Sequence, residues 1–89
     1  MTEDELQKVG VVKHYYPKIG VAVIEVTDTL AVGDTIKIKG TTTDFEQKIQ
    51  SMEIEHGKVE RAKRGDDIGL KVEKRVRERD IVFKKSSVH

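Results

Sequence analysis

Apolar and polar residues alternate along most of the chain with the two-residue period of β-strands that bury one face. Ile36 and Ile38 alternate with lysines, and Ile68, Leu70 and Val72 repeat the same spacing. Segments of this kind are short, and turn residues separate them. The pattern predicts seven strands, at 8–14, 21–26, 36–39, 45–54, 59–62, 68–72 and 81–84.

Two hairpins and one bend are expected between these strands. Pro17 and Gly20 separate the first two strands, and His56-Gly57 predicts a tight two-residue turn. The apolar positions of the fourth strand change face within 49–52, which indicates a bulge or a sharp bend.

Three glycines carry specific expectations about the backbone. Gly33 and Gly65 each precede an aspartate, and we expect tight turns with a positive φ there. Gly69 lies inside a strand, where a missing side chain is costly unless another backbone passes close by.

Short strands in this number, separated by turns, predict an all-β fold, either a sandwich or a barrel. Closure of a barrel removes the strand edges that would invite aggregation. We expect a flexible acidic leader over 1–7, a single β-barrel domain over 8–85 and a disordered tail over 86–89. The predicted core includes Ala22, Ile24, Ile36, Ile38, Ile68, Leu70 and Ile81.

Charge is abundant and unevenly distributed. Charged residues make up 37% of the 89 residues, yet the net charge is only +1. Residues 1–57 hold six Lys/Arg and ten Asp/Glu, whereas residues 58–89 hold eleven and six. The basic second part hints at an anionic partner. Because neither a signal-peptide pattern nor an apolar run of membrane length occurs, we expect a cytoplasmic protein without membrane contact.

Three segments, taken together, resemble domain 2 of translation elongation factors, the β-barrel that follows the GTPase domain in elongation factor Tu. Residues 30–40 enter a strand through a Val-Gly-Asp turn, and residues 49–52 resemble the following strand. Residues 62–70 match the pattern Ala-x-x-Gly-x-x-(Ile/Val)-Gly-(Ile/Leu). The similarity covers 8–84 and implies an all-β fold, a small closed six- or seven-stranded antiparallel Greek-key barrel. Before the last strand the family usually has Gly-Asp, whereas residues 78–80 read Glu-Arg-Asp.

A similar carboxy-terminal barrel occurs in some collagenase-like peptidases, and short free-standing versions are described as elongation factor-like. The resemblance implies a stand-alone, non-catalytic translation elongation factor-like module that docks on RNA or a ribonucleoprotein through a basic face. The alternative is a protein–protein interaction subunit or regulator of a larger translation or RNA-modifying enzyme. Because the phosphate-binding sequence Gly-x-x-x-x-Gly-Lys-(Ser/Thr) is missing, we expect no nucleotide binding and no enzymatic activity.

Basic residues in the second part of the chain are the candidate RNA contacts. They are Lys63, Arg64, Lys71, Lys74, Arg75, Arg77 and Arg79. Lys and Arg on the rim of a barrel can neutralise phosphates and release counterions. Because Glu73, Glu78 and Asp80 are interleaved with them, a solvated face held by intramolecular ion pairs is the alternative. The sequence leaves both readings open.

Tyr15 and Tyr16 are a second candidate for RNA contact. With Lys13 and His14 beside them, their rings could stack on unpaired bases. A small barrel normally uses some of its aromatic residues in the core, so packing is the alternative.

No cofactor and no metal are expected. The histidines lack a partner histidine at ligand spacing; they are His14, His56 and His89. Asp34 and Asp66-Asp67 stand at turns, where aspartate more often bonds its own backbone than serves as a paired carboxylate.

Overall fold

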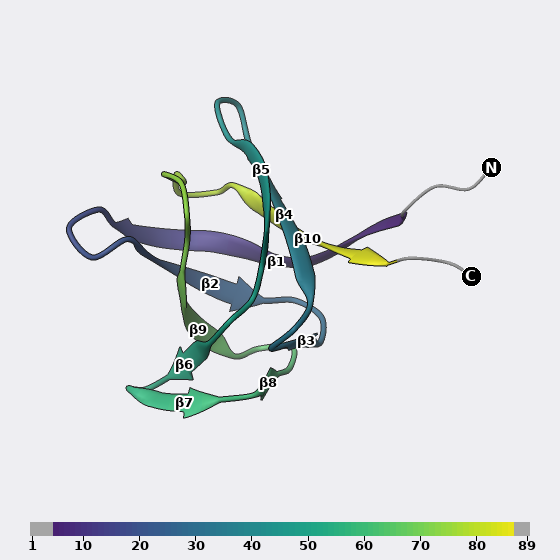
Figure 1. Ribbon diagram of the computed structural model, residues 1–89, viewed down its shortest axis with the longest axis vertical. Helices are drawn as coiled ribbons and strands as arrows, with labels where there is room; N and C mark the ends of the chain where they lie inside the picture. The colour runs from purple at the N-terminus through teal and green to yellow at the C-terminus, as the bar shows by residue number, and fades with distance from the viewer. Residues whose placement is uncertain (1–4, 87–89) are drawn as a thin grey trace.

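The computed structural model describes residues 5–86, and within them the chain forms strands and turns but no helix (Figure 1). The predicted all-β, antiparallel fold is confirmed. The strands are β1 (Glu5–Tyr16), β2 (Val21–Val26), β3 (Leu30–Ala31), β4 (Thr35–Lys39), β5 (Asp44–Lys48), β6 (Met52–Ile54), β7 (Gly57–Val59), β8 (Arg61–Ala62), β9 (Asp67–Lys71) and β10 (Ile81–Ser86). They outnumber the expected seven because two expected strands are divided and β3 was missed.

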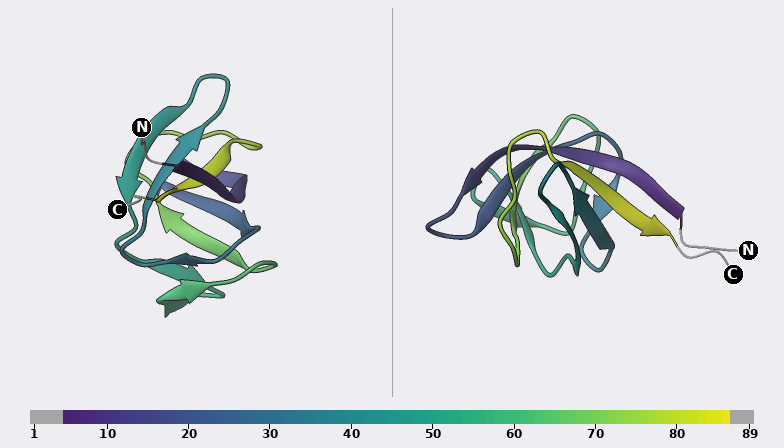
Figure 2. Two further views of the ribbon diagram at one scale, coloured as in Figure 1. Left: turned by 90° about the vertical axis from the view of Figure 1, so that its right-hand side faces the viewer. Right: turned by 90° about the horizontal axis from the view of Figure 1, so that it is seen from above.

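Eight of the strands form one antiparallel sheet in the order β5-β4-β10-β1-β2-β9-β6-β7, and β3 pairs with β8. The sheet curls around a single core, as the two turned views in Figure 2 show. The order places β1 and β2 at the centre, with β9 beside β2 and β6 beside β9. That side of the sheet carries the groove described below.

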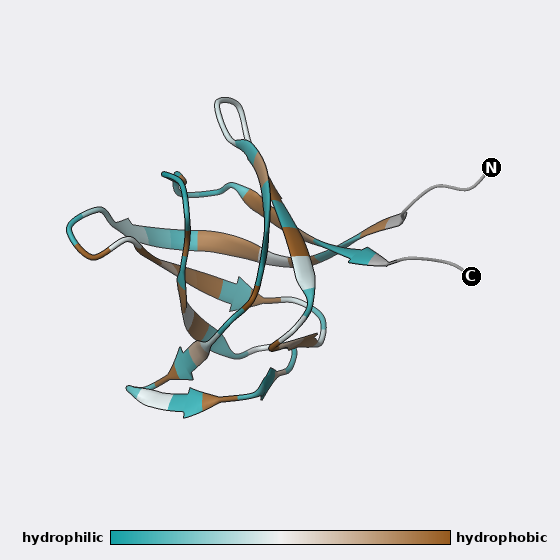
Figure 3. Ribbon diagram, in the orientation of Figure 1, coloured by the Kyte–Doolittle hydropathy of each residue, from teal (hydrophilic) through white to brown (hydrophobic). Residues whose placement is uncertain are grey.

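The core is built from the residues of each strand that face inward. Figure 3 shows the hydrophobic and hydrophilic residues that alternate along the strands. Six of the seven predicted core residues are buried: Ala22, Ile24, Ile36, Ile38, Ile68 and Leu70. Ile81 was predicted wrongly, because it is only partly buried while Val82 is fully buried. Val82 pairs directly with Ile38 across the ladder, and directly paired residues share a face of the sheet.

The first and last strands are longer than expected. β1 begins at Glu5, which pairs with Ser86 of β10, so 5–7 belong to the sheet and not to a leader. The two strands extend together from the body of the barrel in Figure 1. Residues 1–4 and 87–89, the rest of the expected leader and tail, lie outside the described residues. The remainder of the domain division stays a prediction.

The chain bends where the apolar phase of the fourth expected strand changes. β5 ends at Lys48 and β6 begins at Met52, so the predicted bend is confirmed. The next hairpin differs by one residue from the prediction. Ile54 pairs with Gly57, which makes Glu55 and His56 the two turn residues. Their φ values of 51° and 71° are those of a type I′ turn, adopted here without glycine.

Three turns share one hydrogen-bonding pattern. In each, a backbone N–H donates to the carboxylate of an aspartate three residues later at 2.9 Å: Ala31 to Asp34, Lys63 to Asp66 and Arg77 to Asp80. The predicted bonding of Asp34 and Asp66 to their own turns is therefore confirmed. These carboxylates stabilise the backbone.

The residue before each aspartate has a positive φ. The expectation is confirmed at Gly33 (99°) and Gly65 (96°). Arg79 takes the same conformation at 77°, so the Glu-Arg-Asp sequence keeps the turn although it lacks the glycine. Asp80 is buried and lies where a side chain on Gly40 would be. This close approach fixes the turn against the β4–β5 connection.

One side chain joins the edge strand β5 to the chain that leaves β9. Gln47 is only 8% exposed; its Nε2 donates to the carbonyl oxygen of Lys71 at 2.9 Å. Its Oε1 accepts a hydrogen bond from the N–H of Glu73 at 2.8 Å. The glutamine thus makes the two bonds that a backbone ladder would otherwise supply.

Candidate binding surface

The predicted basic site is divided between the two ends of β9. Lys63 and Arg64 lie in the turn before β9. The backbone N–H of the next residue, Gly65, donates to the carbonyl oxygen of Val26. Lys71 ends β9, and the other four basic residues follow it before β10. At ~3.3 Å per residue, β9 separates the two groups by more than ~10 Å. The structure does not bring all seven together.

The acidic residues between the basic ones have other partners. Glu78 Oε2 lies 3.1 Å from His14 Nδ1, and the Asp80 carboxylate accepts the backbone N–H of Arg77. Within residues 5–86, the seven basic side chains make no ion pair with these acids. The alternative of intramolecular ion pairs is therefore wrong for the described residues, and the basic side chains are exposed to solvent.

The two tyrosines lie on opposite faces of β1. Tyr15 is partly buried and packs against the core, whereas Tyr16 is 47% exposed. The Tyr16 ring meets the ring of His14 edge to face, with 4.4 Å between centroids. The structure therefore does not support a joint platform of both rings, and it leaves Tyr16 on the outer surface.

Sequence reasoning missed a groove on the outer face of the sheet. The backbone register places Val23 of β2, Gly69 of β9 and Glu53 of β6 in one transverse row. Because paired residues share a face, the apolar Val23 and the acidic Glu53 flank a position without a side chain. We call this hollow the outer groove; its volume is about 450 Å³.

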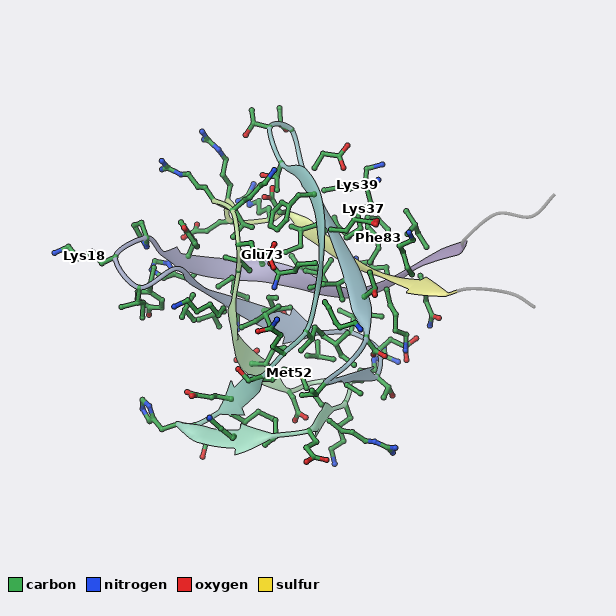
Figure 4. All side chains as sticks on the ribbon, viewed as in Figure 1. Lys18, Lys37, Lys39, Met52, Glu73 and Phe83 are labelled. Carbon is green, nitrogen blue, oxygen red and sulfur yellow. The ribbon has the colours of Figure 1, made fainter. Side chains whose placement is uncertain are left out.

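One wall of the outer groove is apolar. It consists of Tyr16, Ile19, Val21 and Val23. Tyr16 pairs directly with Val21, and Ile19 in the connecting turn is 60% exposed. The turn carries a brown, hydrophobic segment in Figure 3, and Figure 4 shows Lys18 at its tip pointing away from the barrel.

The opposite wall and one end are acidic. Glu53, Glu55 and Asp67 line the groove together with His56. Lys13 approaches Asp67 to 3.3 Å and compensates part of its charge. Lys58 is paired in register with Glu53, but no ion pair joins them within the described residues. Among the described residues, the groove lining itself includes no Lys or Arg.

Gly69 forms the floor for a reason other than the one predicted. No second backbone passes close to it; the only atom within 4 Å of an added Cβ would be Val21 Cγ1, at 3.7 Å. Packing therefore does not require glycine here. The consequence of the missing side chain is the hollow itself.

One sequence signal could have indicated this surface. The first residues of the Val21–Val26 strand are apolar on both faces of the sheet. Val21 and Val23 lie on the outer face, and the buried Ala22 and Ile24 lie on the inner face. A strand that is apolar on both faces indicates that its outer face is also to be covered. The acidic wall comes from β6. The sequence alone does not predict that β6 pairs with β9, which in turn pairs with β2.

The remaining candidate groups are the histidines, of which His14 and His56 lie within the described residues. Within residues 5–86 no cluster of three His, Cys, Asp or Glu side chains could hold a metal ion. His14 contacts Glu78, His56 lies at a hairpin tip, and His89 falls outside the described residues. The described part of the chain also has no helix long and apolar enough to span a membrane. The cytoplasmic location stays a prediction.

The known proteins that this chain matches are named as a protease and a peptidase. No protein-family model matches the sequence. A protein of Methanocaldococcus jannaschii that is named an uncharacterized protease is 44% identical over 77 residues. This match covers 85% of the chain and only 19% of that protein.

Two solved structures share the fold. The C-terminal domain of a protein described as a U32 peptidase of Geobacillus thermoleovorans has a TM-score of 0.85 at 22% identity, covering 90% of this chain and 93% of that domain. Its selenomethionine variant has a TM-score of 0.82 at 20% identity, covering 85% and 96%. At such identities the likeness shows the fold alone.

These findings correct the function expected from the sequence. The matched proteins are named as a protease and a peptidase, so the assignment to a translation elongation factor-like module docking on RNA or a ribonucleoprotein is wrong. The alternative of a protein–protein interaction subunit or regulator of a larger translation or RNA-modifying enzyme is overturned by the same finding, as is the expectation that the protein is not an enzyme. The solved structures support the likeness to the carboxy-terminal barrel of peptidases. Contacts of the basic residues with a partner stay a prediction.

Proposed function

We propose that the chain is the β-barrel domain of a peptidase-type enzyme and gives that enzyme a surface for binding its polypeptide substrate. The observation that carries this proposal is the 44% identity to the archaeal protease over 77 residues. The shared fold with the C-terminal domain of a U32 peptidase supports it.

The chemistry of the described residues supports a binding role within such an enzyme. Peptide hydrolysis needs an activated nucleophile or a metal-bound water. The chain has no cysteine, and residues 5–86 contain no cluster that could hold a metal. The same residues offer a groove with an apolar wall and an acidic wall. Because the match to the archaeal protease spans only 19% of that protein, we assign the hydrolytic groups to the part of the enzyme outside the barrel.

A domain exchange tests this assignment. The archaeal relative would be prepared intact, without the segment aligned to this chain, and with this chain in place of that segment. Each form would be incubated with a reduced, unfolded protein, and the fragments quantified by mass spectrometry. We expect the truncated form to lose at least about tenfold in kcat/KM, because binding energy remote from the scissile bond contributes to catalysis. The exchanged form should recover most of this loss.

Circular dichroism of all three forms controls for folding. Equal cleavage by the intact and the truncated form would contradict the binding role. If the intact relative cleaves no polypeptide at all, the assignment to a peptidase-type enzyme is itself overturned.

A further inference from the structure

We infer that the outer groove binds an extended polypeptide segment in which apolar side chains stand next to Lys or Arg. The inference rests on the proposed function only in identifying this segment as substrate of the enzyme. It names the chemical class that the groove accepts, which neither the relatives nor the fold define.

The apolar wall supplies the contact area. Two of the four most exposed large hydrophobic residues in the described chain, Tyr16 and Ile19, lie at this groove. Behind them, Val21 and Val23 extend the apolar surface along the outer face of β2. An exposed apolar cluster of this kind with a polar rim is typical of an interaction site. A bound segment would place its apolar side chains against this wall.

The acidic wall selects the charge of the occupant. Glu53 and Glu55 face the groove from the β6–β7 hairpin, and Asp67 stands at its end. Among the described residues only Asp67 of these three carboxylates has an ion-pair partner, Lys13, although Lys58 stands opposite Glu53 in the β6–β7 ladder. A segment with Lys or Arg supplies the missing positive charges, whereas Asp or Glu would meet like charge.

The backbone at the rim carries strain that serves this arrangement. Glu55 and His56 both have positive φ values, a backbone conformation that is unfavourable for residues other than glycine. Asn-Gly would make the same turn with less strain, but it would remove the Glu55 carboxylate from the wall. Strained residues of this kind gather where a side chain has a role in binding.

The floor supplies the space. Because Gly69 lies between Val23 and Glu53 in one row, its missing side chain lets a second backbone approach the sheet. A Cβ at this position would make ordinary van der Waals contact with Val21, and the two methyl groups of a valine would extend beyond it into the hollow. Gly69→Val should therefore block the groove while the chain still folds.

The test is a titration followed by amide chemical shifts of the ¹⁵N-labelled chain. The probe is a capped peptide of sequence Lys-Leu-Lys-Phe-Lys, raised to about 1 mM so that weak binding is detected. Two matched peptides replace the lysines by glutamates or the apolar residues by glycines. We expect shifts confined to 16–23, 53–56 and 67–69, with at least about tenfold weaker binding of either matched peptide.

Two variants sharpen the result. Gly69→Val should keep the fold and weaken the lysine peptide at least about tenfold. Glu53→Lys with Glu55→Lys should reverse the preference toward the glutamate peptide. The control pair Glu60→Lys with Glu73→Lys makes the same charge change outside the groove and should leave the preference unaltered.

The inference is overturned if the lysine peptide causes no shifts, causes shifts away from the groove, or binds folded Gly69→Val as well as the parent chain. Any of these results leaves the domain exchange unaffected, because that experiment measures cleavage of a whole unfolded protein. Conversely, peptide binding without recovery of cleavage in the exchanged relative would retain the groove and overturn its role in a peptidase.

Discussion

Arg79 is one of three non-glycine residues in the described chain that have a positive φ. It has φ 77° in a turn whose two counterparts use Gly33 and Gly65. The left-handed conformation costs a non-glycine residue roughly 1–2 kcal/mol, part of which is offset by the smaller entropy of the unfolded chain. We expect Arg79→Gly to raise the free energy of unfolding by about 1 kcal/mol. In a domain of this size that corresponds to a rise of about 4–8 °C in Tm by thermal denaturation.

The reverse change provides the matched control. An added Cβ at Gly33 meets no atom within 4 Å, so Gly33→Arg introduces the φ cost without a steric clash. It should lower the free energy of unfolding by about 1–2 kcal/mol. A stability of Arg79→Gly at or below that of the parent would show that the three turns are not equivalent.

At the scale of elements, Gln47 holds β5 to the chain after β9. Gln47→Ala removes both bonds and leaves the carbonyl of Lys71 and the N–H of Glu73 without this partner. We expect a loss of about 2–3 kcal/mol in urea denaturation, since each buried bond contributes about 1 kcal/mol and unsatisfied groups add to the cost. Gln50→Ala, at an exposed neighbouring position, should stay within about 0.5 kcal/mol. Equal effects of the two variants would exclude this role of Gln47.

The β6–β7 hairpin combines a stability cost with a proposed role in binding. Replacing Glu55-His56 by Asn-Gly should raise the free energy of unfolding by about 1 kcal/mol, because Asn-Gly suits a type I′ turn. The same double variant should weaken the lysine peptide, because one carboxylate leaves the wall. Thermal unfolding and the peptide titration measure the two effects. A gain in stability with unchanged affinity would mean that Glu55 does not contact the peptide.

For the whole molecule, alternation along the chain was enough to predict the all-β fold and most of the core. It failed at Ile81, where two adjacent apolar residues leave the inward phase undetermined until Val82 is seen opposite Ile38. It also placed the β6–β7 turn one residue late, because Gly57 looked like a turn glycine although the pairing puts it in β7. Local sequence predicts an element but not its partner register.

The candidate site depended on information that is not local. Lys63 and Arg64 are close in sequence to the five basic residues at 71–79, but the length of β9 separates the two groups. The outer groove combines residues from β1, β2, β6 and β9, and only the order of strands in the sheet brings them together. The sequence shows that Gly69 stands inside a strand, where glycine is destabilising. That Gly69 leaves a hollow on the outer face depends on its neighbours in the sheet, Val23 and Glu53.

Steady-state kinetics test most directly whether the barrel binds substrate through the outer groove. The enzyme is the archaeal relative with this chain in place of its own segment, either unchanged or as Gly69→Val, and the substrate is an unfolded protein. If the barrel binds substrate through the outer groove, Gly69→Val should raise KM at least about threefold and leave kcat unchanged, because uniform binding is lost and the chemical step is not. An unchanged KM, or a fall in kcat alone, in a variant that circular dichroism shows to be folded would contradict the account.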